Sequence, residues 1–255
     1  MKRHIKISQL LATVAFASVA SLCSGTTLFS TAFDTTTDYD NNFVEILNGA
    51  SVSWDGTNKV VSKTGVDTSG ILFNDGGTAG TDSFSDVTAS IDVSFNAFAA
   101  NSIGIYQGAT NSTGYLGLVN FLSSTSVQLR IFDSNSAPNA GTVGTTLTNV
   151  TLTPTASLTV NTFYTVSFSS ISNGSNQDLT LSLSSVSGTV LATTLITDNT
   201  SAVQSGQIGL RPSSQVLTLD NFAITSSAIP EPATASMIMG AIMVGVAACV
   251  RRRRS

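Results

Sequence analysis

Apolar and polar residues alternate with a period of two along most of the chain. The run from Val87 to Phe95 is the clearest example, because every odd-numbered residue in it is apolar. Successive residues of a strand face opposite sides, so each such run predicts a strand with one buried and one exposed face. The same pattern recurs at residues 127–132, 163–168, 179–183 and 216–224.

Short polar clusters rich in Gly and Asn separate these runs and predict turns. They lie at residues 74–77, 135–141 and 172–176. No amphipathic helical pattern is found between Thr26 and Ala228. Many short strands joined by polar turns predict an all-β fold, a two-sheet antiparallel jelly-roll sandwich.

Three segments of this region resemble a known class of sandwich. Residues 205–211 (SGQIGLR) and 219–224 (LDNFAI) are similar to the closing strands of laminin-G/concanavalin A-like jelly rolls, and residues 161–166 (NTFYTV) resemble the strand that precedes them. The resemblance covers about a third of residues 26–228. It implies a concanavalin A-like or LamG-like body and by itself assigns no activity.

The predicted domain contains neither His nor Cys, since His4, Cys23 and Cys249 all lie outside residues 26–228. This composition excludes Ser-His-Asp and Cys-His nucleophilic catalysis. It also excludes the usual zinc ligand sets and a disulfide framework. The domain must therefore be held together by its hydrophobic core.

Acidic residues dominate the charge of the domain. Residues 26–228 hold four basic residues and fourteen acidic ones, a net charge of −10. The four basic residues are Lys59, Lys63, Arg130 and Arg211. Nucleic acid is excluded as a partner, because phosphate binding needs a basic surface.

Glycoside hydrolysis is the catalytic chemistry that stays open, because it needs only two carboxyl groups. Glu45 is the sole glutamate of residues 26–228, and no Glu-x-Asp-x-x-Glu run is present. A pair of aspartates remains as the alternative, and the sequence singles out none. We therefore predict that the protein is not an enzyme.

The N-terminus has the layout of a secretory signal peptide. A basic segment, residues 1–6, precedes a mostly apolar stretch from Ile7 to Leu22 and a run of small residues. Small residues place the cleavage after Ala20 or after Gly25. Residues 1–25 are assigned to the signal peptide and residues 26–228 to the sandwich domain.

Residues 229–255 hold a proline-rich motif, an apolar span and a basic end in direct succession. The motif is Pro230-Glu231-Pro232, and the 18 residues 233–250 carry no charge. As a helix that span would be about 27 Å long, close to the thickness of a bilayer core. The basic cluster Arg251, Arg252, Arg253 and Arg254 would stop translocation and keep this end in the cytoplasm.

This arrangement resembles the PEP-CTERM sorting signal of Gram-negative bacteria. The resemblance implies that Pro230, Glu231 and Pro232 are recognised by an exosortase, after signal peptidase has acted at the other end. It further implies transient anchoring in the inner membrane, then release or attachment at the cell surface. The family is often found in organisms that make exopolysaccharide, which makes exopolysaccharide a candidate partner.

Two groups of acidic residues could either bind calcium or have a purely structural role. In sandwiches of the resembling class, an Asp near the position of Asp220 can bind a structural Ca²⁺; otherwise Asp220 faces solvent or caps a turn. Asp34, Asp38 and Asp40 only loosely resemble a calcium loop, and we favour a solvated segment. Apart from structural calcium, no cofactor is expected.

Aromatic residues offer one further candidate site. Trp54, the single Trp of the chain, would form a sugar-stacking platform together with Tyr39, Tyr106 and Tyr115. The alternative is that Trp54 belongs to the core, where large aromatics are mostly found.

Together these features predict an exported, surface-sorted, non-enzymatic envelope or extracellular-matrix protein that binds polysaccharide through a β-sandwich. Two alternatives stay open. The first is a secreted, glycan-active hydrolase that uses Asp carboxylates. The second is an unprocessed single-pass membrane protein with an extracytoplasmic domain.

Overall fold

The structure is a computed structural model of the 255-residue chain. It describes most of the predicted sandwich domain. The described residues are 25–48, 52–64, 68–74, 83–98, 102–109, 114–133, 143–200, 205–213 and 216–226. The predicted signal peptide and the predicted sorting signal, with its 233–250 span, lie outside this part of the chain.

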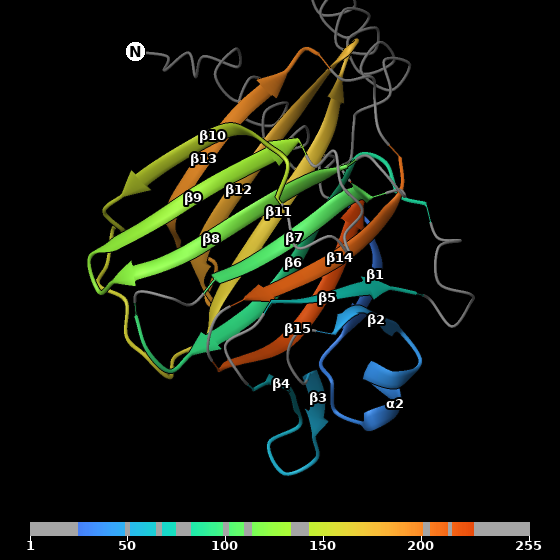
Figure 1. The fold of residues 1–255 in the computed structure, drawn as a ribbon, viewed down its shortest axis with the longest axis vertical. Helices are drawn as coiled ribbons and strands as arrows, with labels where there is room; N and C mark the ends of the chain where they lie inside the picture. Colours follow the sequence, from blue (N-terminus) through green and yellow to red (C-terminus); the bar gives the residue numbers. More distant parts are fainter. Residues whose placement is uncertain are drawn as a thin grey trace, which may run out of the picture. The chain divides into compact units, whose positions relative to one another are not determined.

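Within Thr27–Ser226 the described strands form two sheets that face each other, sheet A behind and sheet B in front in Figure 1. Every pairing among them is antiparallel. Sheet A has the order β13-β12-β11-β6-β15-β4-β3, and β1 also pairs with β15. Its strands are β1 (Thr27–Thr31), β3 (Val52–Asp55), β4 (Val60–Lys63), β6 (Val87–Phe95), β11 (Tyr164–Asn173), β12 (Asn176–Ser185), β13 (Val190–Asp198) and β15 (Leu217–Ser226).

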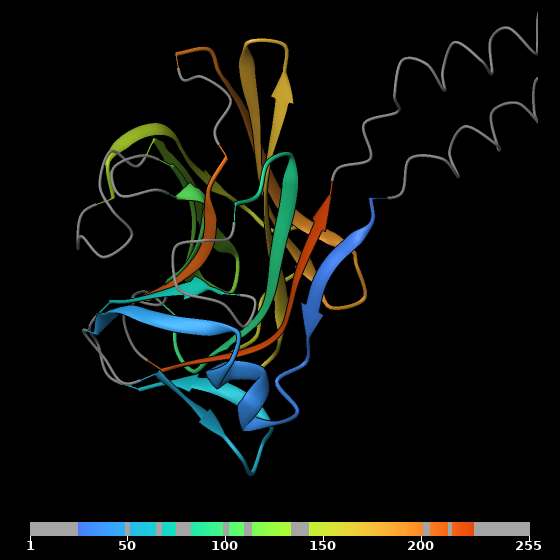
Figure 2. The same cartoon turned by 90° about the vertical axis from the view of Figure 1, so that its right-hand side faces the viewer.

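Sheet B has the order β10-β9-β8-β7-β14-β5-β2. Figure 2 shows the two layers from the side. The strands of sheet B are β2 (Phe43–Asn48), β5 (Ser69–Phe73), β7 (Ser102–Ala109), β8 (Tyr115–Ser123), β9 (Ser126–Asp133), β10 (Thr145–Leu152) and β14 (Gln207–Ser213).

The predicted strands are confirmed. The run at residues 87–95 is β6 with the same bounds, and the other four runs lie in β9, β11, β12 and β15 or overlap them closely. The two closing segments fall in different sheets, because β14 pairs with β7 and β15 pairs with β6. The all-β, two-sheet antiparallel sandwich predicted from the alternation is therefore the observed architecture.

The apolar residues of each run pack between the sheets. In β6 they alternate with half-buried polar residues, and Ile91 and Val93 are fully buried. Phe168 of β11 packs against the inner side of sheet B, where a Cβ on Gly117 would lie only 2.7 Å from its ring. The core is thus dense enough that even one methyl group at Gly117 would clash.

The turn predicted at residues 172–176 is a tight hairpin between β11 and β12. Asn173 pairs with Asn176, which leaves Gly174 and Ser175 as a two-residue loop. Gly174 has φ +66°, a backbone conformation that this turn needs and that glycine adopts without strain. The other two predicted turns lie wholly or largely outside the described residues.

One element departs from the all-β prediction, the five-residue helix α2 (Thr36–Asp40). A side-chain bond holds its start, since the backbone N–H of Thr35 donates to Asp38 Oδ2 at 2.8 Å. A single turn is too short to show helical periodicity, and the sequence pattern therefore missed it. No helix in the described part of the chain is long and apolar enough to span a membrane.

Candidate functional site

The outer face of sheet B, the face turned away from sheet A, carries the most unusual side chains of the domain. Alternation sends one half of each strand inward and the other half outward. In β8, Val119 and Phe121 belong to the main core, whereas Leu116 and Leu118 face out. The register then aligns outward residues of five strands into three rows.

The first row is aromatic and apolar. Tyr106 pairs with Leu116, and Leu116 pairs with Phe132. These three residues and Leu118 form a second apolar cluster, separate from the main core, with Val143 packed against it. All four are buried. An antiparallel sheet commonly has one face on the core and one in water, so an apolar cluster on the outer face calls for an explanation.

The second row has an arginine at each of its two ends. Arg211 pairs with Gly104, Gly104 with Leu118, and Leu118 with Arg130. A Cβ on Gly104 would lie 2.7 Å from Leu116 Cδ1 and 3.3 Å from Arg211 Cβ, so the bare glycine lets these side chains close over the sheet. Both arginines of the domain therefore lie on the same sheet face.

Arg130 is held by an aromatic ring rather than by an acid. Its guanidinium carbon lies 4.6 Å from the centroid of the Phe132 ring, within the range of cation–π attraction. Its Nε has no hydrogen-bond partner among the described residues, which also offer it no ion pair. The residue is half-buried, so part of the guanidinium can reach a ligand.

The third row is polar and open to solvent. Asn120 Nδ2 donates to Gln128 Oε1 at 2.7 Å, and Thr151 of β10 lies beside Gln128. Asn149, the cross-strand neighbour of Arg130, is exposed. The face thus changes from a buried apolar row to a half-exposed set of one guanidinium and several amides. We call Asn120, Gln128, Arg130 and Asn149 the amide–arginine set.

The electrostatics of the buried row depend on Arg211. Burial raises the pKa of Tyr106, and the nearby positive charge of Arg211 opposes this by a smaller amount. The Tyr106 hydroxyl makes no hydrogen bond of good geometry within the described residues. Tyr106 is therefore neutral at physiological pH, and its hydroxyl is buried.

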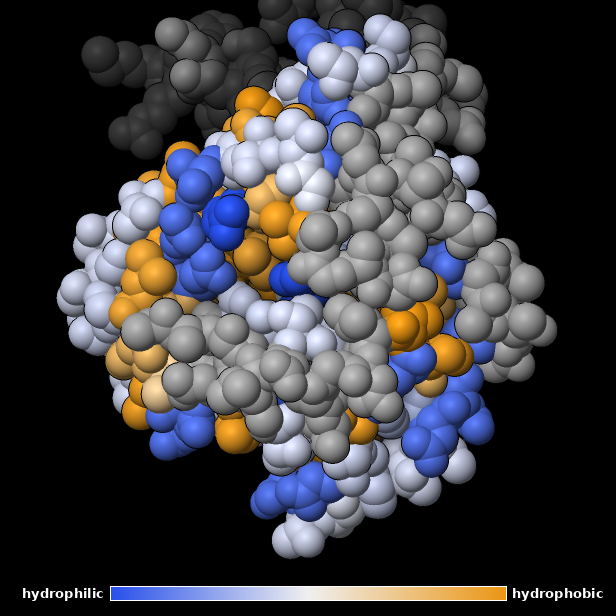
Figure 3. All heavy atoms as spheres, in the orientation of Figure 1, coloured by the Kyte–Doolittle hydropathy of each residue, from blue (hydrophilic) through white to orange (hydrophobic). Residues whose placement is uncertain are grey.

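Figure 3 shows this face directly. Over the middle of sheet B the surface is hollowed, and hydrophobic atoms line the hollow next to strongly hydrophilic ones. A hollow with apolar walls and a few convergent polar groups is the usual form of a small-molecule or saccharide site. This is the candidate binding site of the domain.

The predicted aromatic platform is wrong as a set, because the fold separates its members. Tyr115 faces the main core while Tyr106 faces out from the same sheet. Tyr39 is buried and donates to Glu45 Oε1 at 3.2 Å. Trp54 packs against the main core, and its Nε1 donates to the carbonyl of Phe33 at 2.7 Å, as the alternative interpretation expected.

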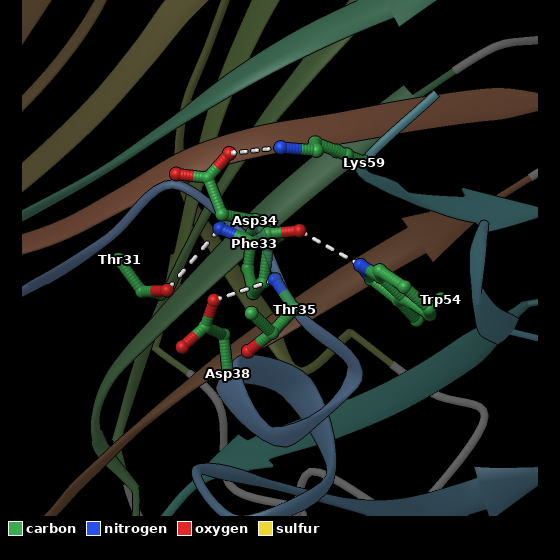
Figure 4. Close-up of polar contacts among 7 residues, drawn as sticks. All are labelled: Thr31, Phe33, Asp34, Thr35, Asp38, Trp54 and Lys59. Atoms are coloured by element: carbon green, nitrogen blue, oxygen red, sulfur yellow. Dashed lines mark hydrogen bonds and ion pairs between the residues drawn. The ribbon is translucent and has the colours of Figure 1, made fainter. Parts of the chain in front are cut away.

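Asp34, Asp38 and Asp40, which loosely resemble a calcium loop, bind local partners in the chain. Figure 4 shows those of Asp34 and Asp38. Asp34 pairs with Lys59 at 3.7 Å, and Asp38 accepts the N–H of Thr35. Asp40 accepts the hydroxyl of Thr36 at 2.9 Å. The three carboxylates thus serve an ion pair and a short helix, and they do not converge.

Asp220 lies on the outer face of sheet A as the cross-strand partner of Asp92. Burial raises its pKa first, and the charges of Asp92 and Asp34 raise it further. The N–H of Asn221, at φ 48° in a bulge, donates to Asp220 Oδ1 at 2.8 Å. Among the described residues no three acidic, His or Cys side chains gather into a metal site, and structural calcium at Asp220 stays a prediction.

The sorting motif Pro230, Glu231 and Pro232 and the basic cluster Arg251, Arg252, Arg253 and Arg254 lie outside the described residues. Sequence reasoning also missed the amide–arginine set. Arg130 stands in an alternating run, where it reads as an ordinary exposed residue. The available signal was that only four basic residues occur in the domain and that two are arginines within strands.

No protein-family model matches the chain, and no curated protein matches it. Solved structures do resemble it. A protein of unknown function with a galectin-like fold from Bacillus subtilis matches with a TM-score of 0.53 at 11% identity, over 80% of this chain and 97% of that one. The CBM2 module of an evolved Dit protein from Lactobacillus casei BL23 phage J-1 gives a TM-score of 0.51 at 10% identity, over 81% and 98%.

A winged bean acidic lectin complexed with methyl-α-D-galactose also matches, with a TM-score of 0.48 at 14% identity, over 78% of this chain and 98% of that one. At such identities a likeness speaks for the fold and not for the ligand. The body of this chain is therefore a two-sheet antiparallel β-sandwich similar in fold to the galectin-like protein.

Proposed function

We propose that the protein is an exported, non-enzymatic saccharide-binding protein, and that the amide–arginine set on the outer face of sheet B is its binding site. The observation that carries this proposal is Arg130, half-buried on Phe132, with no acidic partner among the described residues. Amides and a guanidinium supply the directed hydrogen bonds that sugar hydroxyls need, and the buried apolar row beneath them holds the strands that carry these groups.

The ligand class follows from the charges. Guanidinium groups bind carboxylates and sulfates through paired, charge-assisted hydrogen bonds. In a domain of net charge −10, two of four basic residues lie on this one face. Charges farther away than about 8 Å are screened at physiological ionic strength, so the local arginines decide the preference. The proposed ligand is an acidic polysaccharide, such as one containing uronic acids.

The terminal segments supply the delivery part of the proposal. Signal peptidase would remove residues 1–25, and an exosortase-type enzyme would recognise Pro230, Glu231 and Pro232 while residues 233–250 hold the chain in the inner membrane. The mature protein would then reach the cell surface or the extracellular matrix. Replacing the three motif residues by alanine should leave membrane insertion intact and abolish sorting. Intact-mass analysis of the mature protein distinguishes this from an unprocessed single-pass protein, which would retain the span.

The binding test compares Arg130→Gln with Lys59→Gln. Both changes remove one positive charge, but Lys59 is an exposed residue paired with Asp34. We expect wild type to bind polygalacturonate more tightly than neutral dextran in affinity electrophoresis. Arg130→Gln should weaken that binding about 10- to 100-fold, the size of a lost charged hydrogen bond, while Lys59→Gln leaves it unchanged. Equal effects of the two variants, or no preference for the acidic polymer, would refute the site.

A second candidate function is glycoside hydrolysis by Asp92 and Asp220. This pair is supported by its cross-strand placement and by the raised pKa of Asp220, since the general acid of such chemistry is a carboxyl group with a raised pKa. Against it, Asp92 already accepts the hydroxyl of Thr165 at 2.5 Å and the amide of Asn221 at 3.0 Å. Release of reducing sugar that is lost in Asp220→Asn would establish it, and no release from a broad substrate panel would end it.

A further inference from the structure

Among the described strands, β13 leaves one long edge of sheet A open. β13 stands at the end of the strand order, and β12 is the only described strand that pairs with it. Thr155, which follows β10, covers the beginning of this edge. Its N–H donates to the carbonyl of Leu191 at 3.0 Å, and its hydroxyl donates to that of Val190 at 3.2 Å. No backbone bond from another described segment reaches residues 193–197 on this side.

The register decides which backbone groups of β13 face the open edge. In the hairpin of β12 and β13, the N–H of Ser185 donates to the carbonyl of Thr189 at 2.9 Å. Along a strand the N–H and C=O groups face its two neighbours alternately, so those of Leu183 also face β13. Leu183 pairs with Ala192, whose own groups therefore face β12. From there the alternation is regular, and the groups that face the open edge are those of Thr193, Leu195 and Thr197.

The side chains of the same three residues lie on the outer face of sheet A, and the middle one is apolar. Leu195 is 63% exposed, more than any other large apolar residue among those described. Thr193 and Thr197 flank it, and their hydroxyls are bonded within sheet A, to Ser182 and Asp178. A strand that pairs with this edge would therefore meet one apolar side chain between two threonines.

Two other end strands carry features that hinder pairing with a further strand. β3, at the far end of sheet A, has four residues and ends in Asp55. β2, at one end of sheet B, carries Glu45 with an irregularity of register next to it. Residues 193–197 of β13 (TTLIT) have no charge, no proline and no bulge. A regular, uncharged edge of this kind is a template for a further strand.

We propose that this edge pairs with the same edge of a second copy of the chain, in an antiparallel dimer with two-fold symmetry. A two-fold contact matches one surface patch with itself, so the patch must be self-complementary. The open stretch meets this condition, because its midpoint is Leu195. With the axis there, Leu195 lies opposite Leu195 of the second copy, and Thr193 lies opposite Thr197. All three edge-facing residues of each copy are then paired.

Charge favours a second copy over a basic protein as the occupant. The domain has a net charge of −10, yet residues 193–197 carry none of it, so nothing along the edge itself attracts a basic partner. Asp178 lies one strand back on β12 and bonds to Thr197 and Asn173. Its counterpart in the second copy is three strand spacings away, at least about 14 Å. Charges farther apart than about 8 Å are screened at physiological ionic strength, so the two copies can approach along this edge.

The dimer would join the two A sheets into one continuous sheet. It leaves the outer face of sheet B uncovered, and with it the amide–arginine set. The proposed contact is therefore independent of the proposed saccharide binding.

Disulfide trapping tests the register in the full chain, with Cys23 and Cys249 replaced by Ser. Under mild oxidation Leu195→Cys should form a linked dimer, because directly opposed residues of a hydrogen-bonded pair have Cα atoms about 5.5 Å apart, within disulfide range. Thr193→Cys should not, because the two introduced thiols stand four residues apart along the strands, about 14 Å. A mixture of Thr193→Cys and Thr197→Cys chains should form linked dimers of one chain of each kind.

Sedimentation equilibrium of the full chain in mild detergent measures the association itself. The average mass of wild type should rise with concentration toward that of two chains. Leu195→Lys places like charges opposite each other across the axis and should weaken association about tenfold or more. Leu28→Lys makes the same change at another exposed leucine, on β1, and should associate as wild type does.

Three results would overturn the proposal. The first is a wild type that stays monomeric at every concentration. The second is equal trapping of Leu195→Cys and Thr193→Cys. The third is equal association of the two lysine variants, which is what contact through the apolar residues 233–250 would give.

Discussion

The outer faces of the two sheets come from strands with the same alternation, yet they carry very different side chains. The outer face of sheet A carries mainly Ser, Thr and Asp side chains, among them Ser182 and Thr193, whose hydroxyl oxygens lie 2.8 Å apart. Leu195 of β13 is its most exposed large apolar residue among those described. The outer face of sheet B carries Leu116 and Phe132, both fully buried, and two arginines.

This difference distinguishes side chains that a stable strand needs from side chains that are suited to binding a ligand. A half-exposed strand needs only a polar residue on its wet side, and Ser or Thr meets that need on sheet A. The large apolar side chains and the arginines on the outside of sheet B are more than folding of a half-exposed strand requires. Departures from the simplest pattern tend to mark functional places, which is why we assign the ligand to sheet B.

The largest expected effect concerns the second apolar cluster. If it is packed as a core, Leu116→Ala should lower the free energy of unfolding by about 2–5 kcal/mol. Thr180→Ala, on the outer face of sheet A, should change it by no more than about 0.5 kcal/mol. Urea denaturation of both variants measures the contrast. Similar small losses in both would mean that the two outer faces are equivalent.

Substitutions at Gly117 and Gly104 compare the inner and outer faces of sheet B next. Gly117→Ala would press on the Phe168 ring at 2.7 Å in the core and should cost about 2–3 kcal/mol. Gly104→Ala would meet the flexible end of Leu116 and should cost about 1 kcal/mol. Thermal unfolding ranks the two. A larger loss at Gly104 would show that the outer cluster is the more rigid side.

On sheet A the sharpest test is a pH profile of Asp220→Asn. Because the carboxyl pKa of Asp220 is raised, the folded state favours the protonated form. This preference stabilises the fold at acid pH, and the stabilisation is lost as the pH rises through the pKa of the folded state. At about pH 7 the variant should therefore be more stable than wild type, by less than either glycine effect because the site is partly exposed. The gain should shrink as the pH falls toward about 3.9. A gain independent of pH would point to packing instead.

The smallest expected effect is that of Lys59→Gln. Its ion pair with Asp34 spans 3.7 Å between two exposed side chains, and such pairs contribute about 0–1 kcal/mol. Chemical denaturation should place the variant within about 0.5 kcal/mol of wild type. A marked loss would make it unsuitable as the charge control for Arg130→Gln.

Much of the fold could be predicted because its cause is local. The alternation in Val87–Phe95 predicted β6 with its bounds, and the Gly174 turn predicted the hairpin that follows β11. The helix α2 was missed because it depends on one side-chain bond of Asp38. The aromatic platform was wrong because residue type says nothing about which side of a sheet a Tyr faces.

The sequence by itself determined the fold class, the exclusion of His and Cys chemistry from the domain, and its strong negative charge, since these depend on composition and on the period of a strand. Only the tertiary structure decided that Arg211 and Arg130 share one face, and that Tyr115 and Asp198 meet between the sheets. Both outcomes depend on strand order and register, which pair residues distant in the chain. Local pattern fixes which way a side chain points within its strand, and sheet topology fixes what it meets there.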